Sequence, residues 1–160
     1  MRLRVSAVIC FSFDRMIKIE YPPFRPRIKK ENGKEMIFDG LRKRWLLLTP
    51  EEWVRQNFIQ YLVQVKKYPA VLIAQEKEIM LGELVKRFDI VVYSKATKPL
   101  MIIECKETKV DITSKVLDQA LRYNITLSVP YIVITNGNTT FAFENSMGKL
   151  KELLELPGHI

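Results

Sequence analysis

The chain has 160 residues, 48% of them hydrophobic and 28% charged, which is enough for one domain with a buried core and argues against disorder. Its 26 Lys and Arg against 18 Asp and Glu give a formal net charge of +8, which favours nucleic acid or an anionic membrane surface as partner; an unspecialised basic surface explains the charge equally well. One histidine and two cysteines, Cys10 and Cys105, argue against disulfide frameworks, cysteine-based zinc sites and histidine-based triads, and they fit a reducing, cytoplasmic setting.

The N-terminal residues resemble a secretion signal only in part. Arg2 and Arg4 precede an apolar run at residues 5–13, but this run is short and lacks a small-x-small cleavage site. An upstream start, with Met16 as the native first residue, therefore explains this stretch better than secretion does, and the native start is either Met1 or Met16. No stretch reaches the roughly 18 consecutive apolar residues that a membrane span requires, so no membrane partner is expected.

Residues 21–44 are rich in proline and in basic residues. Three prolines between residues 21 and 26 preclude a regular helix there. We expect an extended arm that leads into the domain. The arm either contacts a phosphate backbone or is simply solvated, and a solvated arm is the more common outcome.

The first helix is predicted to start at Thr49. This residue is a favourable N-cap, Pro50 suits the first helical position, and Glu52 stands three residues after the cap, where a capping box places it. Apolar residues then recur at helical spacing as far as Val65, and Pro69 stops the helix.

Five later segments are short, β-rich and bounded by loop residues, and they are predicted to be strands: residues 72–81, 88–93, 100–106, 131–135 and 139–143. The second and third are apolar on both faces, so they should be central strands of a sheet, joined by a hairpin loop at residues 94–99. A second helix is expected from Thr113 or Ser114 to about Thr126, and a short helix at residues 148–156. The fold class is therefore α/β.

Acidic and basic side chains interrupt the apolar pattern of the two central strands. Glu104 and Lys106 lie two apart and share a face, while Cys105 points into apolar packing. If Tyr93 pairs with Leu100, Asp89 lies opposite Glu104. Two facing carboxylates repel each other unless a cation lies between them, and Mg²⁺ is the natural candidate because it prefers hard oxygen ligands.

In this arrangement Lys106 is placed to orient or deprotonate an attacking water, or to stabilise the charge that develops on a phosphoryl group. The alternative is a solvated strand end, in which Glu104 and Lys106 pair with each other or with nothing. For an isolated E-x-K that alternative is the common outcome. The matched position of Asp89 and the apolar neighbours on both strands favour a metal site.

At this point the chain from Arg42 to Phe143 resembles the PD-(D/E)XK nuclease superfamily, and within it the N-terminal nuclease domain of type I restriction enzyme R subunits. The matching pieces are TPEEWVRQNFIQYL, KRFDIVVY, PLMIIECK, DQALRYN and PYIVITNG. The resemblance implies a restriction-endonuclease-like core, with a mixed central sheet of about five strands flanked by helices. It also implies Mg²⁺-dependent hydrolysis of DNA phosphodiester bonds, with Mn²⁺ as a substitute metal.

The family's metal-binding Asp falls on Asp89, and its Glu and Lys fall on Glu104 and Lys106. A further metal ligand is expected from a backbone carbonyl at the strand end, that of the isoleucine there or that of Cys105. Phe88 replaces the proline of the family's Pro-Asp pair, a position that is loosely kept in these relatives.

Three more residues match the family's pattern. The helical Glu that assists the metal site falls on Glu52, although the capping box explains that residue equally well. The Gln-x-x-x-Tyr element of the related RecB-like nucleases falls on Gln119 and Tyr123, one turn apart on one flank of the second helix. Their alternative is a polar pair at the edge of the core.

We therefore expect an N-terminal extension and arm at residues 1–41, a nuclease-like domain at 42–145 and a tail at 146–160. The expected function is that of a cytoplasmic, metal-dependent deoxyribonuclease that acts on DNA, alone, as a homodimer or with a separate motor or specificity subunit. The alternative hypothesis is a nucleic-acid-binding or assembly module that keeps the nuclease fold but does not cleave.

Overall fold

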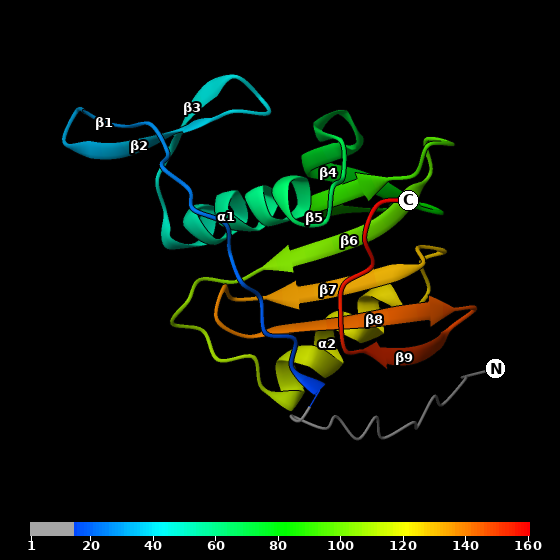
Figure 1. The fold of residues 1–160 in the computed structure, drawn as a ribbon. Coiled ribbons are helices and arrows are strands. Elements are labelled where there is room, and N and C mark those ends of the chain that lie inside the picture. Colours follow the sequence, from blue (N-terminus) through cyan, green and yellow to red (C-terminus); the bar gives the residue numbers. More distant parts are fainter. Residues whose placement is uncertain (1–14) are drawn as a thin grey trace.

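The computed structural model describes residues 15–160, so the interpretation of residues 1–14 lies outside it. The described chain forms a six-stranded sheet, a separate three-stranded sheet and two α-helices (Figure 1). The strands of the larger sheet follow one another in space in chain order: β4 Ile73–Leu81, β5 Leu84–Tyr93, β6 Pro99–Cys105, β7 Tyr131–Thr135, β8 Thr140–Ser146 and β9 Lys149–Leu153. Only β6 and β7 are parallel among these pairs, so the sheet is mixed.

The two helices cover opposite faces of this sheet. Helix α1, Pro50–Gln64, packs against Ile90, Val92 and Ile103, whereas α2, Ser114–Asn124, packs against the alternate strand positions Val91 and Ile102. Because successive strand side chains point to opposite faces, the central strands are apolar on both sides. The α/β class and the central placement of β5 and β6 are as the sequence predicted.

The register of β5 and β6 follows the sequence prediction over most of its length. Ile90 pairs with Ile103 and Val92 with Met101. The register then shifts by one residue, so Tyr93 pairs with Pro99 and not with Leu100 as expected.

The expected short helix at residues 148–156 is wrong, because the chain forms β9 there. Met147 and Gly148 both have positive φ, 52° and 85°, and Ser146 pairs with Lys149. Two consecutive left-handed residues are typical of a two-residue type I′ hairpin turn, whose twist matches that of the flanking strands. The central sheet therefore has six strands where about five were expected.

The expected extended arm is also wrong from Ile28 onward. The chain there forms a three-stranded antiparallel sheet of β1 Ile28–Glu31, β2 Lys34–Asp39 and β3 Arg44–Leu47. Asn32 and Gly33, with φ of 51° and 75°, form the turn between β1 and β2, again as a type I′ turn requires. Residues 21–27, where the prolines lie, contain neither helix nor strand.

Helix α1 begins as its cap predicted. The side-chain oxygen of Thr49 accepts a hydrogen bond from the backbone N–H of Glu52 at 3.0 Å, and Pro50 is the first helical residue. Neither helix within residues 15–160 is long and apolar enough to cross a membrane.

Candidate functional site

Two neighbouring strands carry the predicted motif residues, and one backbone hydrogen bond joins them. Asp89 lies in β5, Glu104 and Cys105 end β6, and Lys106 follows directly. The carboxylate oxygen Oδ2 of Asp89 accepts a hydrogen bond from the backbone N–H of Cys105 at 2.8 Å. Because Cys105 lies between Glu104 and Lys106, this bond holds Asp89 beside the E-x-K segment.

Asp89 and Glu104 do not form the cross-strand pair that the register predicted. The ladder between β5 and β6 begins only at Ile90 and Ile103, and the ladder between β4 and β5 omits Asp89 and Glu76. Glu76 has a φ of 49°, in the left-handed region, so β4 is irregular at this point. Both carboxylates have cationic partners of their own, and these partners differ.

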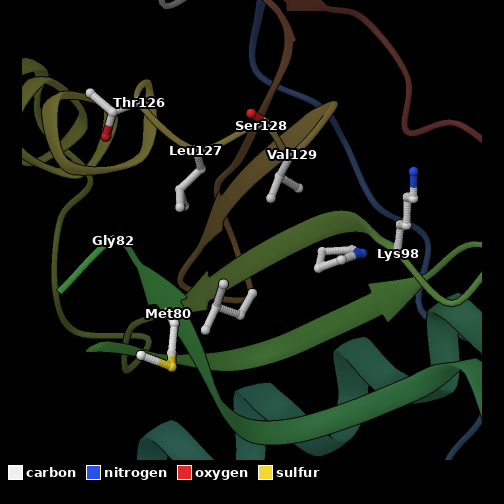
Figure 2. A pocket seen from close by; sticks show the side chains of 9 residues that line it. Met80, Gly82, Lys98, Thr126, Leu127, Ser128 and Val129 are labelled. Carbon is white, nitrogen blue, oxygen red and sulfur yellow. The ribbon is translucent and has the colours of Figure 1, made fainter. Parts of the chain in front are cut away.

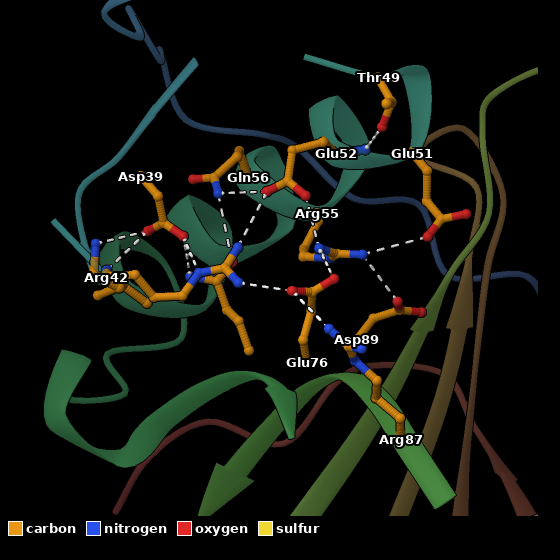
Figure 3. A network of polar contacts seen from close by, with 12 residues as sticks. Asp39, Arg42, Thr49, Glu51, Glu52, Arg55, Gln56, Glu76, Arg87 and Asp89 are labelled. Carbon is orange, nitrogen blue, oxygen red and sulfur yellow. Dashed lines mark hydrogen bonds and ion pairs between the residues drawn. The ribbon is translucent and has the colours of Figure 1, made fainter. Parts of the chain in front are cut away.

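The guanidinium of Arg55 lies at the centre of a carboxylate cluster on the α1 side of the sheet (Figure 3). Its nitrogens lie 2.7 Å from a carboxylate oxygen of Glu52 and 3.1 Å from one of Asp89. Glu51 at 3.3 Å and Glu76 at 3.5 Å complete the cluster. Burial of Arg55 opposes its charge, but the charges of Glu52 and Asp89 outweigh burial and raise the pKa of Arg55. Arg55 is therefore a fixed cation among four anions.

A second arginine extends this cluster to the smaller sheet. Arg42, in the turn between β2 and β3, is 2.6 Å from Asp39 and 2.9 Å from Glu76, and 3.7 Å from Glu52. The side chain of Asp39 is 0% exposed. Burial would raise the pKa of Asp39, but hydrogen bonds from Arg42 and from the backbone N–H of Leu41 outweigh burial and lower it.

Glu52 uses its carboxylate in the cluster and not in a capping box. Its oxygens accept hydrogen bonds from Arg55 at 2.7 Å and from Gln56 at 2.8 Å. Only its backbone N–H is used by the cap residue Thr49. The two roles that the sequence left open therefore fall on different atoms, and the buried carboxylate faces Arg55 and Arg42.

On the α2 side of the sheet, Glu104 has its own cation. Lys86 Nζ lies 3.0 Å from Glu104 Oε1 and donates to Asn124 Oδ1 at 2.8 Å, while the Asn124 amide donates to the same Glu104 oxygen at 3.2 Å. Lys86 Nζ also lies 5.0 Å from the ring centroid of Phe88 and 5.2 Å from that of Tyr123. Tyr123 is thus linked to Glu104 indirectly, because Lys86 contacts both side chains.

The side chains of Lys106 and Gln119 take less part in the polar contacts of the site. The backbone N–H of Lys106 donates to the Thr135 carbonyl at 2.8 Å. Within the described part of the chain, its half-buried side chain forms no ion pair. Its charge still reaches the cluster: burial and the charge of Asp89 raise the pKa of Glu51, and Arg55 and Lys106 oppose that rise. Gln119 is exposed on α2.

The thiol of Cys105 is a core group. It is buried with Met101 and Ile103, as the alternation of the strand predicted. Burial, together with the charge of Asp89, raises the pKa of the Cys105 thiol well above its usual value. The thiol is therefore protonated near neutral pH, and the chemistry at this position is that of its backbone N–H and carbonyl.

The oxygen atoms at the site match the donor preference of Mg²⁺. Asp89 and Glu104 retain side-chain exposures of 24% and 17%, and the Cys105 carbonyl lies at the same strand end. No group of three or more His, Cys, Asp or Glu side chains suited to hold a metal ion occurs between residues 15 and 160. Carboxylate and carbonyl oxygens are the donor type that Mg²⁺ prefers. The side chains of Asp89 and Glu104, however, meet their partners on opposite sides of the sheet, at α1 and at α2, so the structure does not bring the two carboxylates together.

Several residues with a clear place in the site were not singled out from the sequence: the cations and amide Arg42, Arg55, Lys86 and Asn124, and the carboxylates Asp39, Glu51 and Glu76. A signal existed for Arg55, because it follows Glu52 by three positions on a predicted helix, the spacing of a helical ion pair. No local signal existed for the bond between Arg42 and Glu76, since 34 residues separate them.

A shallow pocket of about 540 Å³ is lined by a different set of residues (Figure 2). Met80 and Gly82 line it from the β4–β5 hairpin, and Leu127 and Val129 line it from the loop after α2. It includes none of the predicted site residues.

Comparison with known proteins gives two findings. A family model described as the type I restriction enzyme R protein N terminus matches residues 50–157. The type I restriction enzyme EcoAI endonuclease subunit of Escherichia coli is 34% identical to the chain over 99 residues, which is 62% of this chain and 12% of that subunit. The chain thus spans about an eighth of the length of this relative, and the β1–β3 sheet lies outside the family match.

Proposed function

This chain belongs to the family of type I restriction enzyme R protein N termini, and we propose that it is a metal-dependent nuclease that hydrolyses phosphodiester bonds of DNA. The observation that carries the proposal is the 2.8 Å hydrogen bond from the backbone N–H of Cys105 to Asp89. It ties the carboxylate of one strand to the Glu-x-Lys segment of the next. The proposed core is of the PD-(D/E)XK type, which the order of one helix, three antiparallel strands, a second helix and a parallel strand supports.

In this proposal Asp89, Glu104 and the carbonyl of Cys105 would hold the metal ion, Mg²⁺ or Mn²⁺ in its place. A bound ion of this kind polarises a phosphoryl oxygen and lowers the pKa of a bound water. Lys106, which is free of an ion pair within residues 15–160, orients the attacking water or stabilises the charge that develops on the phosphoryl group. Its position two residues after Glu104 on the strand supports this role.

The cations beside the two carboxylates have a role in the same proposal. Arg55 neutralises Asp89, and Lys86 neutralises Glu104. Such pairing lowers the repulsion between carboxylates while no metal ion is present. Arg55 and Lys86 then compete with the metal ion for these oxygens. Glu52 holds Arg55 in place through its buried carboxylate, and Tyr123 contacts the phosphate backbone or Lys86, with Gln119 one turn before it.

A second candidate function is a nucleic-acid-binding or assembly module that does not cleave. The specific observation in its favour is that both motif carboxylates already have partners, since Arg55 lies 3.1 Å from Asp89 and Lys86 lies 3.0 Å from Glu104. Under either function, a motor or specificity subunit or a second copy of the chain is a proposed partner. The Escherichia coli endonuclease subunit is about eight times longer than the region that matches this chain, so most of that subunit has no counterpart here.

Plasmid nicking separates the two candidates. The purified protein is incubated with supercoiled plasmid in Mg²⁺, in Mn²⁺ and in EDTA. Nicking that requires the ion and is lost in Glu104→Gln supports the nuclease. DNA binding without ion-dependent nicking, alone and with added partner subunits, supports the non-cleaving module.

A further inference from the structure

The positive charge of the chain is concentrated in the small N-terminal sheet. Residues 25–44 contain eight Lys or Arg against three Asp or Glu, whereas residues 45–160 contain 14 against 13. The family match begins at residue 50. The basic sheet β1–β3 is therefore a feature that the family match does not cover, and the region that does match is almost neutral.

Most of these basic side chains have no acidic partner. Within residues 15–160, a carboxylate lies within 4.0 Å only of Lys29, which contacts Glu31 at 2.7 Å, and of Arg42 in the site. The other six are exposed and without an ion pair in the described chain: Arg25, Arg27, Lys30, Lys34, Lys43 and Arg44. Unpaired cations of one sign on a small surface attract a polyanion. The pair of Lys29 with Glu31 is exposed, with 40% and 54% of the side chains accessible, so it contributes little and leaves Lys29 able to exchange Glu31 for a phosphate.

Aromatic rings hold two of the cations in place on one face of the sheet. Phe38 and Trp45 pair across β2 and β3, with ring centroids 5.4 Å apart. The guanidinium carbon of Arg27 lies 4.5 Å from the Phe38 centroid, and Lys29 Nζ lies 4.6 Å from that of Trp45. A guanidinium that stacks by its face keeps the N–H donors of its edge free. These donors match phosphate oxygens in geometry and charge.

The basic sheet is joined directly to the candidate site. Its β2–β3 turn carries Arg42, which bonds Glu76 in β4 at 2.9 Å (Figure 3). In Figure 1 the sheet lies above α1, and the chain passes from β3 directly into the N-terminal end of that helix, which carries Glu51 and Glu52. The sheet that would bind a polyanion is therefore anchored to the candidate site through Arg42 and is continuous with the start of α1.

We propose that the β1–β3 sheet binds the phosphate backbone of DNA through Arg27 and Lys29 and delivers the strand to the adjacent site. The identification of the polyanion as DNA rests on the proposed function. Binding of this kind depends on phosphate charge, so it has little sequence preference and weakens steeply with salt.

The test uses the full chain and a labelled random-sequence duplex, with fluorescence anisotropy measured over a series of NaCl concentrations. The test variant is Arg27→Gln/Lys29→Gln, and the matched control is Lys95→Gln/Lys98→Gln, which removes two exposed charges from the 94–99 loop. Each lost phosphate contact lowers the slope of log K against log salt by about 0.9. We expect the test variant to lose about 2 from the slope and the control to keep the wild-type slope. Equal slopes in the test variant and the wild type, or equal losses in both variants, overturn the proposal.

A spectroscopic readout tests the same face without removing charge. The chain has two tryptophans, so Trp53→Phe leaves Trp45, next to Lys29, as the only one. DNA should change the Trp45 emission of this variant in low salt. Unchanged emission at saturating DNA contradicts the proposed surface.

The outcomes distinguish this inference from the proposed function. If the protein nicks DNA in an ion-dependent way but its DNA binding does not depend on Arg27 and Lys29, the proposed DNA-binding role of the sheet is wrong and the proposed nuclease function stands. If DNA binding depends on both residues but no nicking occurs, the proposed DNA-binding role of the sheet is supported, and the chain functions as the non-cleaving module. Anionic phosphatidylserine vesicles are the third arm: loss of vesicle binding in the test variant, with DNA binding intact, means that the sheet serves a membrane surface and overturns the proposal.

Discussion

The carboxylate of Asp89 accepts a hydrogen bond from the backbone N–H of Cys105 and, with its other oxygen, contacts Arg55 at 3.1 Å. One side chain thus connects β5, β6 and α1. The strand ladder that would otherwise continue from Ile90 and Ile103 ends here. Asp89 therefore has a structural role that is separate from any role as a ligand.

This relationship predicts that Asp89→Asn destabilises the protein in EDTA. Asparagine keeps an oxygen that can accept the Cys105 N–H but loses the ion pair with the buried Arg55. A hydrogen bond to a charged group contributes about 1.5–3 kcal/mol, and partial exposure of Asp89 places the expected loss at the lower end. Urea unfolding measures it. Asp118→Asn, which removes an exposed helical pair with Arg122, is the control and should cost at most about 0.5 kcal/mol. A midpoint equal to or above wild type for Asp89→Asn contradicts the geometry.

Removing Arg55 should have a larger effect. Arg55→Met leaves Glu51, Glu52, Glu76 and Asp89 close together without their shared cation. Breaking a buried ion pair from one side costs about 3–5 kcal/mol. We expect a loss of this size near neutral pH, and a smaller one at pH 4, where protonation relieves the repulsion between the carboxylates. A loss that does not depend on pH would mean that Arg55 contributes through packing alone.

Acid should remove the contribution of Asp39. Its pKa is lowered from the usual value of 3.8 in the folded protein, as hydrogen bonds from Arg42 outweigh burial. A lowered folded pKa stabilises the protein above pH 3.8 and ceases to do so as the pH falls through the folded value. The difference in unfolding free energy between wild type and Asp39→Asn should therefore be constant above about pH 5 and shrink below pH 3.8. Chemical unfolding from pH 2.5 to 7 measures this difference, and a constant difference over the whole range rules out the linkage.

The sequence predicted the elements whose signals are local. The cap at Thr49 placed α1, and the apolar runs of β5 and β6 placed both strands and three of their four paired positions. It missed β1–β3 because prolines and basic residues obscured the Asn32-Gly33 hairpin signal, and it missed β9 because Met147 adopts a left-handed conformation that β-turn rules assign chiefly to Asn, Asp and Gly.

The sequence pointed to Asp89, Glu104 and Lys106 through strand spacing, an expected hairpin register and the family resemblance, and their role as a site stays a prediction. It could not point to their partners. The cations beside the carboxylates come from elsewhere: Arg55 is 34 residues from Asp89, and Lys86 is 18 residues from Glu104. No pattern in a single sequence specifies such pairs, since tertiary packing decides which cation each carboxylate meets.

Lys86 should compete with the metal ion for Glu104. Lys86→Met removes the ammonium 3.0 Å from the Glu104 carboxylate while keeping most of the aliphatic chain over the Phe88 and Tyr123 rings. For a partly exposed pair the competing attraction is about 1 kcal/mol, so Mg²⁺ affinity should rise about fivefold. Isothermal titration with Mg²⁺ measures this directly, with Lys77→Met on β4 as control. Weaker Mg²⁺ binding by Lys86→Met contradicts the competition.

The proposed hydrolytic site joins Asp89 to the E-x-K segment and depends on a divalent ion. Nicking of supercoiled plasmid tests it with wild type, Asp89→Asn, Glu104→Gln and Lys106→Ala, each shown to be folded by circular dichroism and supplied with Mg²⁺ or Mn²⁺. We predict that the wild type nicks only with the ion, and that each variant loses at least about a hundredfold in rate, as for removal of a group that acts in the transition state. Ion-dependent nicking at the wild-type rate in Glu104→Gln and Lys106→Ala would contradict the account.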